Sequence, residues 1–351
     1  MNVPCRRRRA ELTRSRLDLT RSQILAFRRR VGALDERLPR GSRSLRRAAW
    51  AGMQDSMPRA ALLSIHARVE GAHPSSWEDP SLVQVWGPRF STYVVPARDR
   101  ALFTLGRLPD DAPGRQRAEE IAARLHAFLD GRRMGDGEAG EALGVNSNLF
   151  RYAAPTGTVL IRWEGARQPT IWSVPRPQVD PLDARRELAR RYLRVFGPTT
   201  PALFATWAGI GPAEADAAFD ALKRSLTAVR TPIGEAWILA RDEPAFRAPA
   251  GPAAAARLLP SGDAYYLLQG ADRELLVPDA ERRGELWTSR VWPGAVLVAG
   301  EIVGTWRRAQ EKLTIHPWRR LTRARRDAVE AEAAGLPLPG VERGITVRWD
   351  D

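Results

Sequence analysis

The order of helical and strand-like segments repeats three times in this chain, and this repetition limits the fold more than any other sequence feature. In each repeat, segments with helical spacing of apolar residues precede two short strand-like runs. Helices are expected at 20–31, 44–53, 58–69, 116–129, 138–143, 147–153, 181–196, 201–209 and 212–226, with a connecting helix at 97–106. Strand pairs are expected at 82–87 with 92–96, 158–163 with 170–174, and 227–230 with 236–240. Three helices followed by a hairpin, three times over, is the plan of tandem winged-helix units.

The region after the linker at 244–252 has a different pattern. Short strand-like runs are separated there by Gly, Pro and Asp, and Ala299-Gly300 is a hairpin turn signal between two of them. The expected strands are at 257–260, 265–269, 275–278, 295–298, 301–307 and 312–317, followed by a helix at 322–334 and a strand at 345–349. A separate, strand-rich C-terminal domain is therefore expected.

The chain is strongly basic, with a formal net charge of +14. Arg supplies nearly all of this charge, since Lys223 and Lys312 are the only lysines. Codon bias toward Arg is an alternative explanation for the choice of Arg over Lys, but not for the sign of the charge. Residues 1–16 hold six Arg and one Glu, so the remainder still carries +9. The folded part is thus basic, as a phosphate-binding surface requires.

The sequence also lacks the features of several protein classes. No apolar run approaches the roughly 20 residues that cross a bilayer, and residues 1–16 lack the apolar segment of a secretory signal. Cys5 is the only cysteine, so neither a disulfide framework nor a Cys-based zinc site is expected. The sequence has no phosphate-binding Gly loop, no metal-binding spacing of His with carboxylates and no nucleophilic Ser motif. We expect a cytoplasmic, nucleoid-associated protein that uses no metal or cofactor.

A polar turn, Gly52-Met53-Gln54-Asp55-Ser56, separates two of the expected helices. The hairpin that follows contains Arg89-Phe90-Ser91-Thr92-Tyr93. Further on, the segments at 191–198, 257–263 and 293–306 follow in order. This succession resembles the AlkZ/YcaQ class of winged-helix DNA-binding proteins, a family of bacterial DNA glycosylases. In that family the turn reads Gly-Leu-Gln-x-Gln or Gly-Leu-Gln-x-Asp, and the first wing is usually centred on Arg-Gly-Thr-x-His.

The resemblance covers nearly the whole chain from about Leu19, and it implies an α+β fold. It implies three tandem winged-helix units followed by a small β-barrel-like domain. The expected boundaries are 19–107, 108–177, 178–243 and 244–351, after a disordered basic tail at 1–18 that is either solvated or contacts phosphates. The resemblance also implies excision of bulky alkylated purines, with Gln54 holding the water. The sequence departs from the family at the positions that matter for the chemistry: Ser56 stands in the third slot of the turn, and Phe90 and Tyr93 replace the wing Gly and His, whereas Arg89 is retained.

Gln54, Asp55 and Ser56 are the candidate catalytic residues. Hydrolysis of an N-glycosidic bond builds positive charge on the deoxyribose, so it needs a group that positions or deprotonates water and a negative or dipolar group that faces the sugar. A Ser hydroxyl is a poor base without a partner, but Asp55 supplies a carboxylate one residue earlier, and adjacent residues in a turn can face one pocket. Two alternatives stay open: these residues only cap the helix that begins at Pro58, or they bind substrate without catalysis.

The candidate DNA-binding residues are Arg89, Tyr93 and Arg59. Arg89 can serve either as a phosphate ligand or in a structural ion pair, and Tyr93 can stack on a base or ribose but cannot act as a base near neutral pH. Other conspicuous residues are expected to serve structure: His66, Trp50, Trp86 and Asp263, the last being also a family landmark.

These features together indicate a monomeric protein that binds double-stranded DNA, with alkylated or crosslinked duplex as candidate substrate, and that needs no obligate protein partner. As an enzyme it would be monofunctional with water as the nucleophile, since no Lys stands near the motif to form a Schiff base. The alternative is a non-catalytic winged-helix DNA-binding protein, either a lesion sensor or a regulator. A regulator normally needs two-fold symmetry to read paired half-sites.

Overall fold

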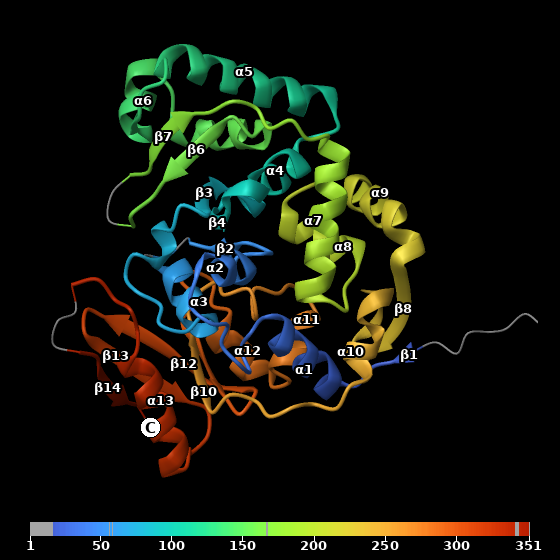
Figure 1. Cartoon of the computed structure of the whole chain (residues 1–351), viewed down its shortest axis with the longest axis vertical. Helices are drawn as coiled ribbons and strands as arrows, with labels where there is room; N and C mark the ends of the chain where they lie inside the picture. The colour runs from blue at the N-terminus through green and yellow to red at the C-terminus, as the bar shows by residue number, and fades with distance from the viewer. Residues whose placement is uncertain (1–16, 56, 58, 166–167, 341–343, 351) are drawn as a thin grey trace, which may run out of the picture.

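The computed structural model describes residues 17–55, 57, 59–165, 168–340 and 344–350. The basic tail expected at residues 1–16 lies outside the described residues, whereas Leu17 and Asp18, expected to belong to it, form strand β1 (Leu17–Asp18). The chain combines many helices with three sheets, so the α+β class is confirmed (Figure 1). No helix in these ranges is both long enough and apolar enough to cross a bilayer.

The first region contains the predicted hairpin and helices near the predicted positions, but the helix predicted at 44–53 ends at Ala48 and Met53 lies in a strand. Its elements are α1 (Arg21–Val31), α2 (Ser42–Ala48), β2 (Met53–Gln54), α3 (Ala60–Arg68), β3 (Leu82–Trp86), β4 (Thr92–Pro96) and α4 (Arg100–Phe103), with 3-10 helices η1 (Ser76–Glu78), η2 (Pro88–Phe90), η3 (Ala97–Asp99) and η4 (Leu105–Arg107). Thr20 and Gln23 form a capping box at the start of α1, which satisfies N–H groups of its first turn. Pro88 begins η2, the short turn that joins β3 to β4.

The second and third regions repeat this order with local differences. The second has α5 (Ala112–Leu129), β5 (Met134–Gly135), α6 (Asp136–Leu143), the 3-10 helix η5 (Ser147–Thr156), β6 (Val159–Arg162) and β7 (Thr170–Ser173). The third has α7 (Pro181–Phe196), α8 (Pro201–Ala208), α9 (Pro212–Leu222), η6 (Lys223–Ser225), β8 (Leu226–Thr231), β9 (Gly234–Leu239), η7 (Ala240–Asp242) and α10 (Glu243–Arg247). Pro is the first residue of α7, α8 and α9. The N–H group that Pro lacks would have no partner within the helix at this position, so Pro costs no hydrogen bond there.

The sheets join these regions to one another. A six-stranded sheet of order β2-β4-β3-β6-β7-β5 combines the hairpins of the first and second regions, through the pairing of Gln84 with Ile161. The start of the chain pairs with the third region, because β1 lies parallel to β8 in the three-stranded sheet β1-β8-β9. The repeated units therefore share backbone hydrogen bonds.

The C-terminal region consists of β10 (Ala256–Leu259), α11 (Asp272–Leu276), α12 (Ala280–Leu286), β11 (Gly294–Val298), β12 (Glu301–Ala309), β13 (Lys312–Pro317), α13 (Arg323–Ala334) and β14 (Thr346–Trp349). Its sheet has the order β10-β11-β12-β13-β14, and its two end strands do not pair in the described residues, so the sheet is open and not a closed barrel. Two strand predictions were wrong: 265–269 contains a turn and no strand, and the predicted strand 275–278 begins in helix α11 and continues without regular structure. The apolar run from Tyr265 to Leu268 is buried, and a short buried run does not distinguish a strand from other buried backbone.

One hydrophobic core links all four regions. It contains Tyr93 of β4, Leu160 of β6, Trp207 of α8 and Tyr266 of the C-terminal region. Figure 1 shows the second region at the top, α7 to α9 on the right and the C-terminal sheet at the lower left, with β2 between them. The polar turn that begins at Gly52 therefore lies where the regions meet.

Candidate active site at Gln54

Strand β2 fixes the backbone of the candidate catalytic turn. Met53 pairs with Val94 and Gln54 pairs with Tyr93, and the Asp55 N–H donates to the Thr92 carbonyl over 2.8 Å. Successive side chains of a strand point to opposite faces. Gln54 and Asp55 accordingly contact different partners, so the structure does not bring the amide and the carboxylate into one pocket.

The side chain of Gln54 is held by two groups from the first hairpin. Arg89 donates from Nη2 to Gln54 Oε1 over 3.0 Å, and the Tyr93 hydroxyl donates to the same oxygen over 3.4 Å. Gly262 of the C-terminal region lies against the amide, since a Cβ built on this residue would stand 3.3 Å from Gln54 Cδ. With φ of +74° and this close approach, position 262 favours glycine on two counts.

Arg89 connects Gln54 to the third region. Its Nη1 donates to the Trp207 carbonyl near the end of α8 over 3.3 Å, and its own backbone is left-handed, with φ of 54°. Gly209 allows this contact, because a Cβ there would lie 3.1 Å from Arg89 Cα. The predicted phosphate ligand is thus half-buried and bonded to two protein oxygens.

Asp55 is buried and caps α3. Its carboxylate accepts from the Ala61 N–H over 2.9 Å and from Gln84 Nε2 over 2.8 Å. Burial raises the pKa of Asp55 to about 6, although the hydrogen bonds from Ala61 and Gln84 and the charges of Arg59 and Arg162 oppose the rise. The capping role considered from the sequence is therefore present for Asp55.

The other predicted residues take different places. Ser56 lies outside the described residues. Arg59 is the N-cap residue of α3, with φ of 66°, and its guanidinium carbon lies 4.5 Å from the ring centroid of Trp77. Its charge acts on the Asp55 carboxylate. The Tyr93 ring is only 1% exposed and packs against Gly52 and Gly87, so it is not available to stack on a base; its hydroxyl instead contacts Gln54.

The structure adds one interaction that sequence spacing did not indicate. Arg68 of α3 and Asp263 form a buried two-bond ion pair, and the Ser64 hydroxyl also donates to Asp263 over 2.7 Å. Asp263, expected as a landmark or a turn residue, thereby anchors the segment that places Gly262 against Gln54. The landmark pointed to Asp263, but nothing in the sequence indicated its partner 195 residues away.

The residues expected to serve structure mostly do so. Trp86 is 2% exposed, whereas Trp50 is half-buried. His66 is buried with its Nε2 3.6 Å from Glu332 of α13, and burial lowers the pKa of His66 to about 4, so the ring is neutral at pH 7. Among the residues that the structure describes, no group of His, Cys, Asp and Glu could hold a metal ion.

A family model described as "DNA glycosylase AlkZ-like" matches residues 47–337. The structure is similar to that of Streptomyces sahachiroi DNA glycosylase AlkZ, with a TM-score of 0.76 and 20% sequence identity, over 95% of this chain and 100% of that chain. No curated protein matches the sequence. The structural likeness therefore establishes a common fold across nearly the whole chain.

Proposed function

The chain belongs to the AlkZ-like DNA glycosylase family, and from this premise we propose that it binds duplex DNA and hydrolyses the N-glycosidic bond of a bulky alkylated purine. The observation that carries the proposal is the fixed amide of Gln54. Its oxygen accepts hydrogen bonds from Arg89 and Tyr93, which come from the wing beside it. Gln54 is the residue that orients the attacking water in this proposal, and Arg89 and Tyr93 position Gln54.

The chemistry of the substrate suits a site that has few acid and base groups. Alkylation at N7 places a positive charge on guanine, so the base leaves without protonation by an acid. The remaining task is to hold water against the sugar while positive charge develops there. An amide that is already oriented lowers the entropic part of the activation barrier, because the water is positioned before the reaction. Lys223 lies in η6 and Lys312 in β13, and neither belongs to the first region, which holds Gln54, so we propose hydrolysis by water and not by a Schiff base.

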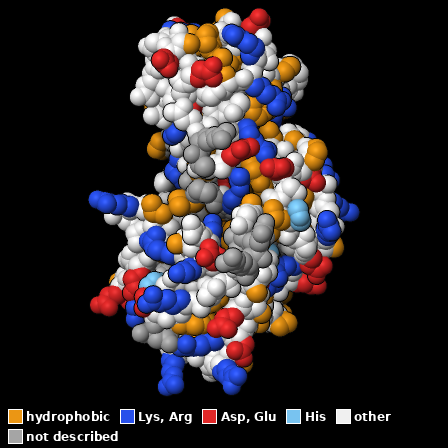
Figure 2. All heavy atoms as spheres, turned by 90° about the vertical axis from the view of Figure 1, so that its left-hand side faces the viewer, with side chains coloured by type: hydrophobic (Ala, Val, Ile, Leu, Met, Phe, Trp, Pro, Cys, Tyr) orange, Lys and Arg blue, Asp and Glu red, His pale blue; other side chains and the backbone are white. Residues whose placement is uncertain are grey.

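We propose that duplex binding uses charge spread over several units. Figure 2, which views the left-hand side of Figure 1, shows Lys and Arg side chains over the whole height of that face and not in one patch. Dispersed phosphate contacts give affinity without sequence preference. On this proposal the units at 19–107, 108–177 and 178–243 act as three winged helices and 244–351 as the C-terminal module, in a monomeric, cytoplasmic, nucleoid-associated protein.

A second candidate function rests on a specific observation at Asp55. This carboxylate is occupied by the Ala61 and Gln84 hydrogen bonds, and the family's third catalytic slot holds Ser56. A site with Gln54 but without a free carboxylate fits a lesion-binding protein that does not release the base. Both candidate functions predict tighter binding to damaged than to intact duplex, and only base release separates them.

Base release can be measured directly. Purified protein is incubated with duplex that carries one N7-alkylated guanine, and abasic sites are then revealed by strand cleavage in mild alkali. The proposal expects cleavage by the wild type and none by Gln54→Ala at equal lesion binding. Binding to the lesion without cleavage by the wild type would instead favour the lesion-binding function.

A further inference from the structure

A cavity of about 860 Å³ lies beside the candidate active site and contains none of Gln54, Arg89 and Tyr93. Its walls come from α1, α2 and α7, together with the segments 50–52 and 264–265. These two segments lead directly to Gln54 and Gly262. The cavity is therefore next to the Gln54 site, but its lining contains none of the three side chains that form that site.

The lining of this cavity is selectively basic. Eight arginines and one carboxylate, Asp242, contribute to it, whereas the whole chain has 55 basic and 41 acidic residues. Five of the arginines contact carboxylates of the protein: Arg28, Arg68, Arg98, Arg194 and Arg241. The side chains of the other three, Arg43, Arg46 and Arg47 of α2, form neither a hydrogen bond nor an ion pair within the described part of the chain, although the charge of Arg46 also interacts with Asp79. An anion would relieve the repulsion among them.

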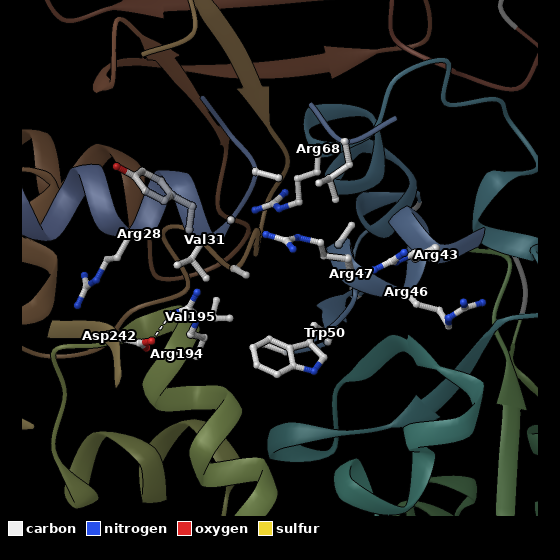
Figure 3. Close-up of a pocket in the computed structure, with 18 of the residues that line it drawn as sticks. Arg28, Val31, Arg43, Arg46, Arg47, Trp50, Arg68, Arg194, Val195 and Asp242 are labelled. Carbon is white, nitrogen blue, oxygen red and sulfur yellow. Dashed lines mark hydrogen bonds and ion pairs between the residues drawn. The ribbon is translucent and has the colours of Figure 1, made fainter. Parts of the chain in front are cut away.

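An aromatic ring lies among these charges. Figure 3 shows the Arg47 side chain reaching into the open centre of the cavity, beside Arg68, with the ring of Trp50 below it and Arg194 across the space. Trp50 is half-buried, and the guanidinium carbon of Arg191 lies 5.2 Å from its ring centroid. Single-stranded nucleic acid is recognised by such a combination, in which guanidinium groups hold the phosphates and an aromatic ring stacks on a base.

We propose that this cavity binds an unpaired segment of a DNA strand, with one base stacked on Trp50 and the adjoining phosphate on Arg47. The volume lies within the range of roughly 300–1,000 Å³ that is typical of small-ligand sites, so it admits nucleotide units and not a duplex. The site is distinct from Gln54, and the proposal stands whether or not Gln54 supports base release.

The test is binding of a short fluorescent oligothymidylate, followed by anisotropy, to the full-length protein. Arg47→Ala and Trp50→Ala should each weaken binding by about 5- to 100-fold, and Trp50→Phe, which keeps a stacking surface, should lose much less. Arg290→Ala is the matched control, because it removes one exposed arginine outside the cavity. Melting temperatures identify any variant that fails to fold, and Trp50→Phe and Arg47→Gln then replace it.

Several outcomes would overturn the proposal. These are the absence of oligothymidylate binding by the wild type, equal losses in Arg47→Ala and Arg290→Ala, and thymidine monophosphate competing as strongly as the oligonucleotide. Base release from alkylated duplex is measured in parallel, so that an effect on the Gln54 site can be distinguished from an effect on the cavity. Gln54→Ala should retain oligothymidylate binding, so a failure of the proposed glycosylase activity leaves this test intact.

Discussion

Arg68 and Asp263 form an ion pair between α3 and the C-terminal region, with Nη1–Oδ2 and Nη2–Oδ1 distances of 2.6 and 2.7 Å. Both side chains are almost fully buried, and the pair sets the position of Gly262 against Gln54. The candidate site therefore depends on contact between regions that are far apart in sequence.

Removing one member of this pair should destabilise the protein strongly. Arg68→Ala leaves the Asp263 carboxylate buried and uncompensated, so we expect the free energy of unfolding to fall by about 3–5 kcal/mol. Urea unfolding measures the change. The double variant Arg68→Met/Asp263→Leu leaves no buried charge and should recover part of the loss. A loss below about 1 kcal/mol, typical of exposed pairs, would contradict the structural role.

Arg89→Ala should lower base release more than it lowers duplex affinity. Without Arg89 the Gln54 amide loses its shorter hydrogen bond, and a displaced catalytic group costs about 10- to 100-fold in rate. Single-turnover release and duplex affinity are measured on the same variant, with Arg89→Lys as the charge-conserving control. If Arg89 is instead a phosphate ligand, the main effect will be weaker duplex binding. The slope of log K against log salt concentration will then be shallower by about 0.9.

Asp55→Asn should change how stability depends on pH. The folded pKa of Asp55, about 6, lies above the ordinary value of 3.8. Between these values the folded state holds the proton more tightly than the unfolded state, so Asp55 favours folding below about pH 4 and this contribution is lost as the pH rises through 6. The stability of Asp55→Asn relative to wild type should therefore rise by up to about 3 kcal/mol from pH 4 to pH 7. Unfolding curves at several pH values measure it, and a constant difference would contradict the buried carboxylate.

Ser56→Asp restores the family's Gln-x-Asp form at the third slot of the turn. We expect faster base release, since a carboxylate stabilises developing positive charge on the sugar. Ser56→Asn is the control of similar size without the charge. Wild type and Ser56→Asp that both bind the lesion and release no base would support the lesion-binding function.

Duplex affinity should fall steeply with salt and vary little with sequence. Two phosphate contacts already predict about a tenfold loss between about 50 and 200 mM salt, and more contacts predict a larger one. Titration of two unrelated duplexes at several salt concentrations measures both properties. Affinity that does not change with salt would exclude phosphate contacts as its main source.

Sequence by itself determined the elements whose causes are local. The capping box at Thr20, the hairpin turn at Pro88 and the Pro residues that open α7 to α9 follow from hydrogen-bonding needs within a few residues. The motif around Gln54 and the order of later segments indicated the family, and the family model confirmed it. Local spacing was less informative in short apolar runs, so 265–269 and 275–278 were predicted as strands although neither forms one.

Tertiary structure alone decided which groups meet at Gln54. The strand geometry of β2 turns Asp55 away toward Gln84, and chain folding brings Arg89 to Gln54 and Asp263 to Arg68. These contacts are satisfied by partners 29, 35 and 195 residues distant, and a buried charge or amide accepts any partner of suitable geometry. The residue types at the candidate site can therefore be read from the sequence, whereas the pairing of these residues depends on how the four regions pack.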